Sequence, residues 1–183
     1  MQDFELNPYP ADQIPNIRIG GHLERKENQL SICYMVGGDI DEILLPKPAA
    51  STRQDDLWKA TCFEFFFALP NLPEYWEANM SPSGAWNVYH MDAYRRISFR
   101  EETNIQQLPF DFQKLDAKGP INIYLYLLEA SMNLSPVLQA SQKIQLGITA
   151  IIQTKDGTET YWALTHPGTQ ADFHLRASFM IEL

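Results

Sequence analysis

Apolar and polar residues alternate along much of the chain, which is the pattern of half-buried β-strands. Residues 30–36 place Leu, Ile, Tyr and Val at every second position, and residues 144–152 repeat this with Ile, Leu, Ile, Ala and Ile. We expect residues 17–24 and 30–36 to pair as a hairpin. Further strands are predicted over residues 43–45, 57–69, 75–80, 86–91, 121–128, 144–152, 159–164 and 178–183.

Turn signals separate these predicted strands. Gly37-Gly38-Asp39, the tetrapeptide from Ser81 to Gly84 and Asp156-Gly157 are typical of tight turns. The single predicted helix lies within residues 129–143, where Pro136 limits it to a turn or two. The sequence therefore predicts an all-β fold, an antiparallel β-sandwich that resembles a jelly roll. We expect one domain over residues 17–183, preceded by an extended N-terminal arm over residues 1–16.

Composition fits one soluble domain and narrows its partners. The 183 residues are 45% hydrophobic and 20% charged, with a net charge of −9. Such a negative field repels phosphate backbones, so we expect no nucleic acid partner. No P-loop or Rossmann glycine motif is present. The two cysteines, Cys33 and Cys62, lie in apolar runs, which favours buried thiols over a disulfide or a zinc site.

The N-terminal residues favour a cytoplasmic protein. The first six residues are acidic and polar and lack the basic start and apolar run of a secretory signal. No apolar stretch reaches the length of a membrane span; residues 121–128 form the longest one. We therefore predict a cytoplasmic location, while the sequence leaves the oligomeric state open.

Several polar side chains fall on one side of the predicted strands. Trp58 and Glu64 share the even positions of the strand at 57–69, and Glu77 and Asn79 share one face of the next strand. Burying a tryptophan contributes up to about 4–6 kcal/mol, so an exposed Trp58 beside a polar loop suggests a partner that covers it. Sugars suit such a surface, because their C–H faces stack on indole while carboxylates and amides bind their hydroxyls. The alternative is that the preceding loop buries Trp58 at the edge of the sandwich.

Five segments together resemble the DOMON-like domains related to family-9 carbohydrate-binding modules. They are residues 53–67 (RQDDLWKATCFEFFF), 75–89 (YWEANMSPSGAWNVY), 161–168 (YWALTHPG), 172–174 and 179–183. Such domains are β-sandwiches that hold a terminal glucose-type sugar between two tryptophans. The resemblance implies that Trp58 and Trp162 are these tryptophans and that Glu64, six residues after Trp58, accepts hydrogen bonds from the sugar.

The same resemblance suggests three further ligand contacts and two departures. Asn79 lies where a polar contact is expected, and Arg53 and Glu77 are additional candidates. Members of the family tend to have a basic residue at the position that Glu77 occupies here, and a plainer polar turn where this sequence has residues 165–168 (THPG). Both departures suggest that the fold is kept while the ligand has changed. Some relatives carry calcium, but no calcium-loop pattern is present. Non-catalytic binding of a small saccharide or glycoconjugate is the predicted function, with no cofactor.

Three other functions remain open from the sequence. A haem or metal-binding redox domain of the DOMON type would draw its ligands from Met35, Met80, Met91, His90, His166 and His174. His166, Asp172 and His174 could hold a metal or could simply pin the C-terminal loop. A glycoside hydrolase would need a carboxylate pair such as Glu64 and Glu77, but we predict no enzymatic activity. A protein-interaction domain that kept the fold and lost the sugar site is the third alternative.

Overall fold

The computed structural model describes residues 1–94, 99–117 and 123–183. In these residues the chain forms β-strands and short 3-10 turns, without an α-helix. The strands are β1 (Gln2–Pro8), β2 (Ile17–Lys26), β3 (Gln29–Gly38), β4 (Cys62–Ala68), β5 (Tyr75–Met80), β6 (Trp86–Met91), β7 (Phe99–Glu101), β8 (Phe110–Ala117), β9 (Ile123–Asn133), β10 (Gln145–Gln153), β11 (Glu159–Ala163) and β12 (Ile181–Glu182). The 3-10 turns are η1 (Ile40–Glu42), η2 (Leu57–Lys59) and η3 (Arg176–Ser178).

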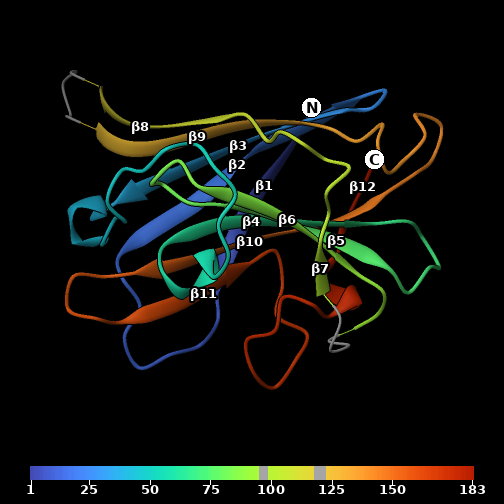
Figure 1. The fold of residues 1–183 in the computed structure, drawn as a ribbon. Coiled ribbons are helices and arrows are strands. Elements are labelled where there is room, and N and C mark those ends of the chain that lie inside the picture. Colours follow the sequence, from blue (N-terminus) through green and yellow to red (C-terminus); the bar gives the residue numbers. More distant parts are fainter. Residues whose placement is uncertain (95–98, 118–122) are drawn as a thin grey trace.

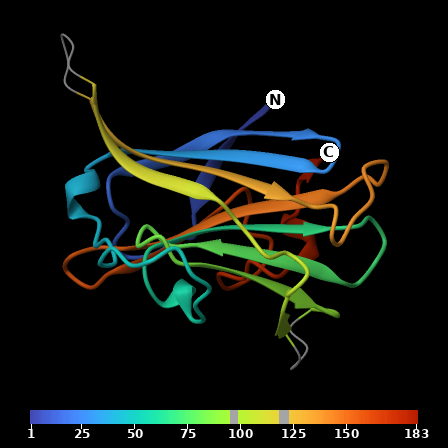
Figure 2. The same ribbon diagram turned by 45° about the horizontal axis from the view of Figure 1, so that its top comes forward.

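The strands form one antiparallel sheet that curls into two facing layers (Figures 1 and 2). Its order is β7-β6-β5-β4-β10-β11-β1-β2-β3-β9-β8, and β12 pairs with β10. The curl occurs at β1, where residues 2–6 pair with β2 while Asn7 and Pro8 pair with β11. The first layer therefore contains β1, β2, β3, β9 and β8, and the second contains β11, β10, β4, β5, β6 and β7. This arrangement confirms the all-β antiparallel prediction.

The main hydrophobic core lies between the two layers. It combines residues of the first layer, such as Leu23 and Tyr34, with residues of the second, such as Phe65 and Ile148. Tyr34 connects the layers, because its hydroxyl donates a 2.6 Å hydrogen bond to the backbone carbonyl of Glu64. Every second residue of each strand points into this core, so the alternate residues of the second layer point outward.

A second hydrophobic cluster covers part of the outer face of the second layer. It includes Phe66, Tyr75 and Tyr89 from the strands and Phe173 and Phe179 from the C-terminal segment. The C-terminal segment, drawn in red in Figure 1, thus folds back against β4, β5 and β10. We call this outward-facing side of the second layer the outer face; the part that the C-terminal segment leaves uncovered carries the polar residues described below.

Several elements differ from the sequence-based expectation. The predicted strand at 57–69 begins at Cys62, because Asp56 adopts a left-handed conformation (φ 63°) and starts the turn η2 instead. No helix forms within residues 129–143, because β9 continues to Asn133. A turn follows, and its residues Leu134 and Leu138 are buried, which explains their helix-like spacing. The predicted strand at 43–45 is reduced to a single bridge at Ile43. The short strands β7 and β8 were not predicted.

The N-terminal segment also has a role that its sequence did not reveal. Residues 2–8 are extended, as expected, but they form strand β1. Residues 2–6 of this strand pair with β2, and residues 7–8 pair with β11. The backbone beside them is unusually close: a Cβ atom at Gly21 would lie 1.8 Å from the carbonyl oxygen of Cys33. Glycine at this position therefore allows β2 to lie between β1 and β3.

Candidate functional site

A row of polar side chains crosses the outer face of the second layer. The strand register aligns Thr149 on β10, Glu64 on β4, Asn79 on β5 and Asn87 on β6. Glu77 lies one step along β5, opposite Phe66 and Tyr89. All of these polar side chains are buried; Glu64 is 2% exposed and Asn79 is completely inaccessible. We call Thr149, Glu64, Asn79, Asn87 and Glu77 the polar row.

Two carboxyl groups in the polar row have few partners. The Thr149 hydroxyl donates to Glu64 at 3.1 Å, and the Asn79 amide donates to Glu77 at 2.7 Å. Among the described residues, no lysine, arginine or histidine forms an ion pair with either carboxylate. The side-chain oxygen of Asn79 is buried and accepts no hydrogen bond. The polar row therefore has more hydrogen-bond acceptors than donors.

Burial changes the acidity of both carboxyl groups. Loss of hydration raises the pKa of Glu77 to about 7, although the hydrogen bond from Asn79 acts in the opposite direction. Burial, followed by repulsion from Glu77, raises the pKa of Glu64 well above its ordinary value. Two acids without a compensating cation are costly in the interior of a protein, and strongly shifted acids of this kind are typical of functional sites.

A small hollow lies beside Glu77. It has a volume of about 60 Å³ and is lined by Trp58, Glu77, Tyr89 and Met91. Trp58 is half-buried on turn η2 and packs edge-to-face against Tyr89, with ring centres 5.7 Å apart. The hollow holds a few waters or one small chemical group, whereas a whole sugar ring is several times larger.

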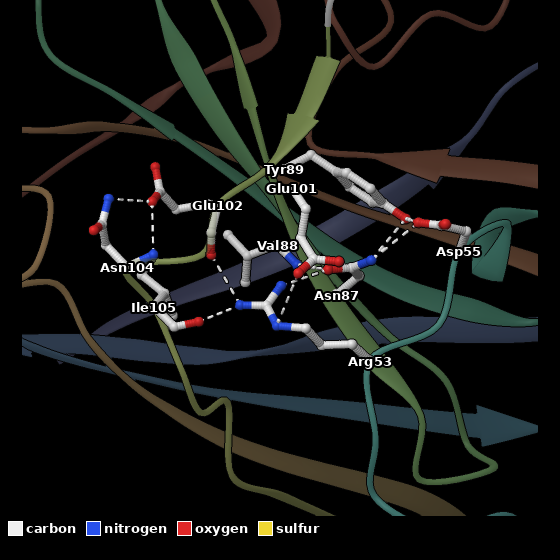
Figure 3. Close-up of polar contacts among 9 residues, drawn as sticks. All are labelled: Arg53, Asp55, Asn87, Val88, Tyr89, Glu101, Glu102, Asn104 and Ile105. Atoms are coloured by element: carbon white, nitrogen blue, oxygen red, sulfur yellow. Dashed lines mark hydrogen bonds and ion pairs between the residues drawn. The ribbon is translucent and has the colours of Figure 1, made fainter.

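The loop before η2 fixes one wall of this hollow, and Figure 3 shows its contacts. The Arg53 guanidinium donates to the Asn87 side-chain oxygen at 2.6 Å, and it also donates to the carbonyls of Glu102 and Ile105. The Asp55 carboxylate accepts hydrogen bonds from Asn87 at 3.1 Å and from the Tyr89 hydroxyl at 2.8 Å. Arg53 is thus held within the protein and positions Asn87 and, through Asp55, Tyr89.

A larger hollow of about 520 Å³ lies on the outer side of the first layer. Two of the polar groups that line this hollow have partners within the protein. Glu24 forms an ion pair with Lys26 at 2.8 Å, and the Ser131 hydroxyl accepts a hydrogen bond from Gln29 at 2.5 Å. Because the polar row contains two buried acids that form no ion pair with a described residue, the row and its hollow are the stronger candidate site.

The structure brings four predicted site residues together, places Arg53 beside them and separates Trp162 from them. Trp58, Glu64, Glu77 and Asn79 share the outer face of the second layer. Arg53 lies beside them, but its guanidinium contacts protein groups. Trp162 lies elsewhere.

The predicted pair of Trp58 and Trp162 does not form. Trp162 pairs with Ala150 and points into the main core, where it is 3% exposed and donates a 3.0 Å hydrogen bond to Thr160. The neighbouring Tyr161 points outward instead and packs against the outer cluster, half-buried. The one-residue alternation of β11 causes this difference. The sequence analysis did not identify Tyr161, Tyr89 and Met91 as site residues. Their alternation with core residues along the strands could have indicated that they face outward.

The C-terminal histidines hold the C-terminal segment in place. His166 packs edge-to-face against Tyr9, at 5.2 Å between ring centres, and its Nε2 lies 2.8 Å from the Asn7 carbonyl. His174 Nδ1 lies 2.9 Å from the Tyr75 hydroxyl, and Asp172 accepts a 3.0 Å hydrogen bond from the His174 backbone. These contacts are those expected of a pinned loop. Among the residues that the structure describes, no three His, Cys, Asp or Glu side chains form a group suited to a metal ion.

The remaining candidates for haem or redox chemistry are dispersed. Met80 is enclosed in the main core, Met91 lines the small hollow, and Met35 is 41% exposed on the first layer. Cys33 and Cys62 are both buried free thiols, which confirms that prediction. In the described part of the chain, no helix is long and apolar enough to span a membrane.

The fold is a β-sandwich that resembles the fold of carbohydrate-binding modules. A candidate carbohydrate-binding protein from Bacteroides uniformis ATCC 8492 superposes with a TM-score of 0.64 at 14% sequence identity, over 97% of this chain and 84% of that one. The resemblance inferred from the sequence is thereby confirmed at the level of the fold.

Two structures of family-9 carbohydrate-binding modules from Caldicellulosiruptor kristjanssonii are more distant. The complex with cellotriose has a TM-score of 0.48 at 11% identity, over 98% of this chain and 80% of that chain. The complex with glucose has a TM-score of 0.41 at 11% identity, over 82% and 69%. Comparison of the sequence with protein-family models and with curated proteins found no match.

Proposed function

We propose that this protein binds a small saccharide, without catalysis, at the polar row on the outer face of the second layer. The observation that carries this proposal is the small hollow on this face, where the half-buried Trp58 lies beside the carboxyl group of Glu77, which forms no ion pair with any described residue. Buried polar groups in folded proteins almost always have hydrogen-bond partners, and leaving one unpaired costs about 1–3 kcal/mol. Hydroxyl groups of a bound sugar would donate further hydrogen bonds to the Glu77 carboxyl group.

The aromatic side chains around the row provide the apolar part of such a site. Trp58 is half-buried and lines the small hollow beside Glu77, and in this proposal the C–H face of a sugar ring contacts it there. The hollow between Trp58 and Glu77 accepts a hydroxymethyl group or one edge of the ring, while the rest of the sugar lies outside. Tyr161 also faces outward, half-buried against Phe173, and in this proposal it takes the role first assigned to Trp162.

The position of the carboxyl groups favours binding over hydrolysis. A glycosidase places its two carboxyl groups on either side of the bond that it cleaves. Glu64 and Glu77 instead project from neighbouring strands of the same sheet face, and both are buried. In this proposal they accept hydrogen bonds from the sugar, and Arg53 acts as a positioning residue behind Asn87. The cytoplasmic location inferred from the sequence stays a prediction.

Isothermal titration calorimetry with glucose and cellobiose tests the proposal. We expect saturable binding by the wild-type protein and a loss of affinity of about fivefold to thirtyfold in Trp58→Ala, because a stacked ring contributes about 1–2 kcal/mol. The matched control is Met35→Ala, which removes an exposed apolar side chain from the other layer and should bind normally. Absence of binding across mono- and disaccharides, or equal affinity in Trp58→Ala, would refute the proposal.

A further inference from the structure

The larger hollow on the outer side of the first layer has a chemistry that the proposed function does not use. We propose that this hollow is a second binding site and that its ligand is a small organic amine held by the carboxylate of Glu129. The volume of about 520 Å³ is typical of pockets that bind small organic molecules. The hollow lies over β2, β3 and β9, so it is separate from the polar row on the other layer (Figure 1).

The strand register places a row of ionisable side chains across the first layer. Asp3 on β1 lies opposite His22 on β2, and His22 lies opposite Cys33 on β3. Cys33 in turn lies opposite Glu129 on β9, and Glu129 lies opposite Asp111 on β8. Residues directly opposite each other on neighbouring strands point to the same face, so all five side chains share the outer face. His22, Cys33 and Glu129 line the hollow.

The thiol of Cys33 faces the hollow and has no partner in the protein. Cys33 is only 5% exposed, yet it lines the hollow. Among the described residues, it forms no disulfide and its side chain takes part in no hydrogen bond. Burial, followed by repulsion from Glu129, raises the pKa of this thiol, so it keeps its proton at neutral pH. A neutral thiol is soft and weakly polar, which suits the carbon atoms next to an amine.

The negative charge around Glu129 is not balanced. Glu129 and Asp111 are exposed acids directly opposite each other, and like charges in this position repel. Neither acid forms an ion pair with a residue that the structure describes. The other carboxylate that lines the hollow, Glu24, is already neutralised by Lys26 at 2.8 Å. A cation bound beside Glu129 would relieve the repulsion across β8 and β9.

An amine complements these groups better than a metal ion does. In the described part of the chain, no three His, Cys, Asp or Glu side chains are grouped to hold a metal ion. An ammonium group donates three hydrogen bonds, and the Glu129 carboxylate and the hydroxyls of Ser31 and Ser131 are acceptors on the wall of the hollow. The remaining volume accommodates the carbon skeleton of the amine over Cys33.

Labelling of Cys33 by methanethiosulfonates of opposite charge tests the proposal at neutral pH. In this reaction the Cys33 thiolate, after losing its proton to solvent, attacks the sulfenyl sulfur; a disulfide forms and methanesulfinate leaves. Relative to the rates with free cysteine, we expect the cationic aminoethyl reagent to label Cys33 about tenfold faster than the anionic sulfonatoethyl reagent. In Glu129→Gln this ratio should fall below about threefold. The control variant is Asp12→Asn, an exposed acid beyond the opposite end of the β1–β2 hairpin, which should keep the ratio.

Protection of the thiol shows whether an amine occupies the hollow. We expect putrescine at millimolar concentration to slow labelling of Cys33 by the uncharged methyl methanethiosulfonate, and butanediol, its uncharged analogue, to leave the rate unchanged. This protection should disappear in Glu129→Gln. Mass spectrometry of the digested protein assigns the label to Cys33, while Cys62 is completely inaccessible and should stay unlabelled.

Several results would overturn the proposal. Absence of labelling at Cys33 would contradict its access from the hollow. Equal labelling by the two charged reagents, or a ratio that survives in Glu129→Gln, would show that Glu129 does not select a cation. Absence of protection by putrescine, or equal protection by sodium chloride at the same ionic strength, would show that no amine is bound. Failure of saccharides to bind at the polar row leaves this proposal standing, because the two sites lie on different layers.

Discussion

Replacing Glu77 by glutamine should stabilise the protein in a pH-dependent manner. Burial raises the pKa of Glu77 from 4.5 to about 7 in the folded chain, so the folded state holds this proton more tightly than the unfolded state. Below pH 4.5 the group is protonated in both states and carries no penalty. Between pH 4.5 and about 7 the unfolded state loses its proton first, so the free energy of unfolding decreases as the pH rises. Above that range the penalty is complete.

The size of the penalty follows from the same pKa values. One pKa unit corresponds to about 1.4 kcal/mol, so moving from 4.5 to about 7 corresponds to about 3 kcal/mol. Glutamine has nearly the same shape as glutamate, has no charge and can still accept the hydrogen bond from Asn79. Glu77→Gln should therefore gain up to about 3 kcal/mol at pH 8 and almost nothing at pH 4.5.

Urea denaturation at pH 4.5, 6 and 8, followed by tryptophan fluorescence, measures this difference. The matched control is Glu129→Gln, which removes an exposed acid and should change stability by less than about 0.5 kcal/mol at each pH. An equal effect of Glu77→Gln at all three pH values, or destabilisation at pH 8, would show that the buried carboxylate is already compensated.

Three further substitutions test the fold around the site. Trp162→Ala should cost about 3–5 kcal/mol in urea denaturation, because the side chain fills the main core; a cost below about 1 kcal/mol would contradict its burial. Gly21→Ala should lower the free energy of unfolding by more than about 3 kcal/mol, because its Cβ atom would overlap a carbonyl oxygen. Gly37→Ala should lower it by less than about 1 kcal/mol, because no atom lies within 4 Å of the added Cβ. Similar effects at both glycines would be inconsistent with this geometry. Arg53→Met should cost about 1–3 kcal/mol and weaken sugar binding by displacing Asn87; full affinity in this variant would exclude a positioning role.

Alternation of apolar residues predicted most strands because one face of each points into the core. Residues 30–36 and 144–152 alternate clearly, and both became parts of long strands, β3 and β10. The same rule failed over residues 57–61, where Leu57 and Trp58 continue an apolar pattern although the backbone turns at Asp56. A left-handed backbone conformation at an aspartate leaves little trace in hydrophobic patterning.

The polar row was partly predictable, and its aromatic partners were not. Glu64, Glu77 and Asn79 could be placed on one face because strand pleating fixes their direction once the strands are known. Both faces of β11 are covered by other residues, so Tyr161 and Trp162 look equally suited to either side. Only the register of β11 against β10 shows that Tyr161 faces the site.

The most direct test of the central claim is a nitrogen-15 NMR titration of the protein with glucose. Trp58 lines the hollow of the proposed site, and the Asn79 side-chain amide is hydrogen-bonded to Glu77 beside it, whereas the Trp162 indole lies in the main core. Saccharide binding at the polar row predicts that the Trp58 and Asn79 signals shift with a common dissociation constant while the Trp162 signal stays in place. Shifts confined to β2, β3 and β9, which border the larger hollow of the first layer, or no shifts at all, would contradict it.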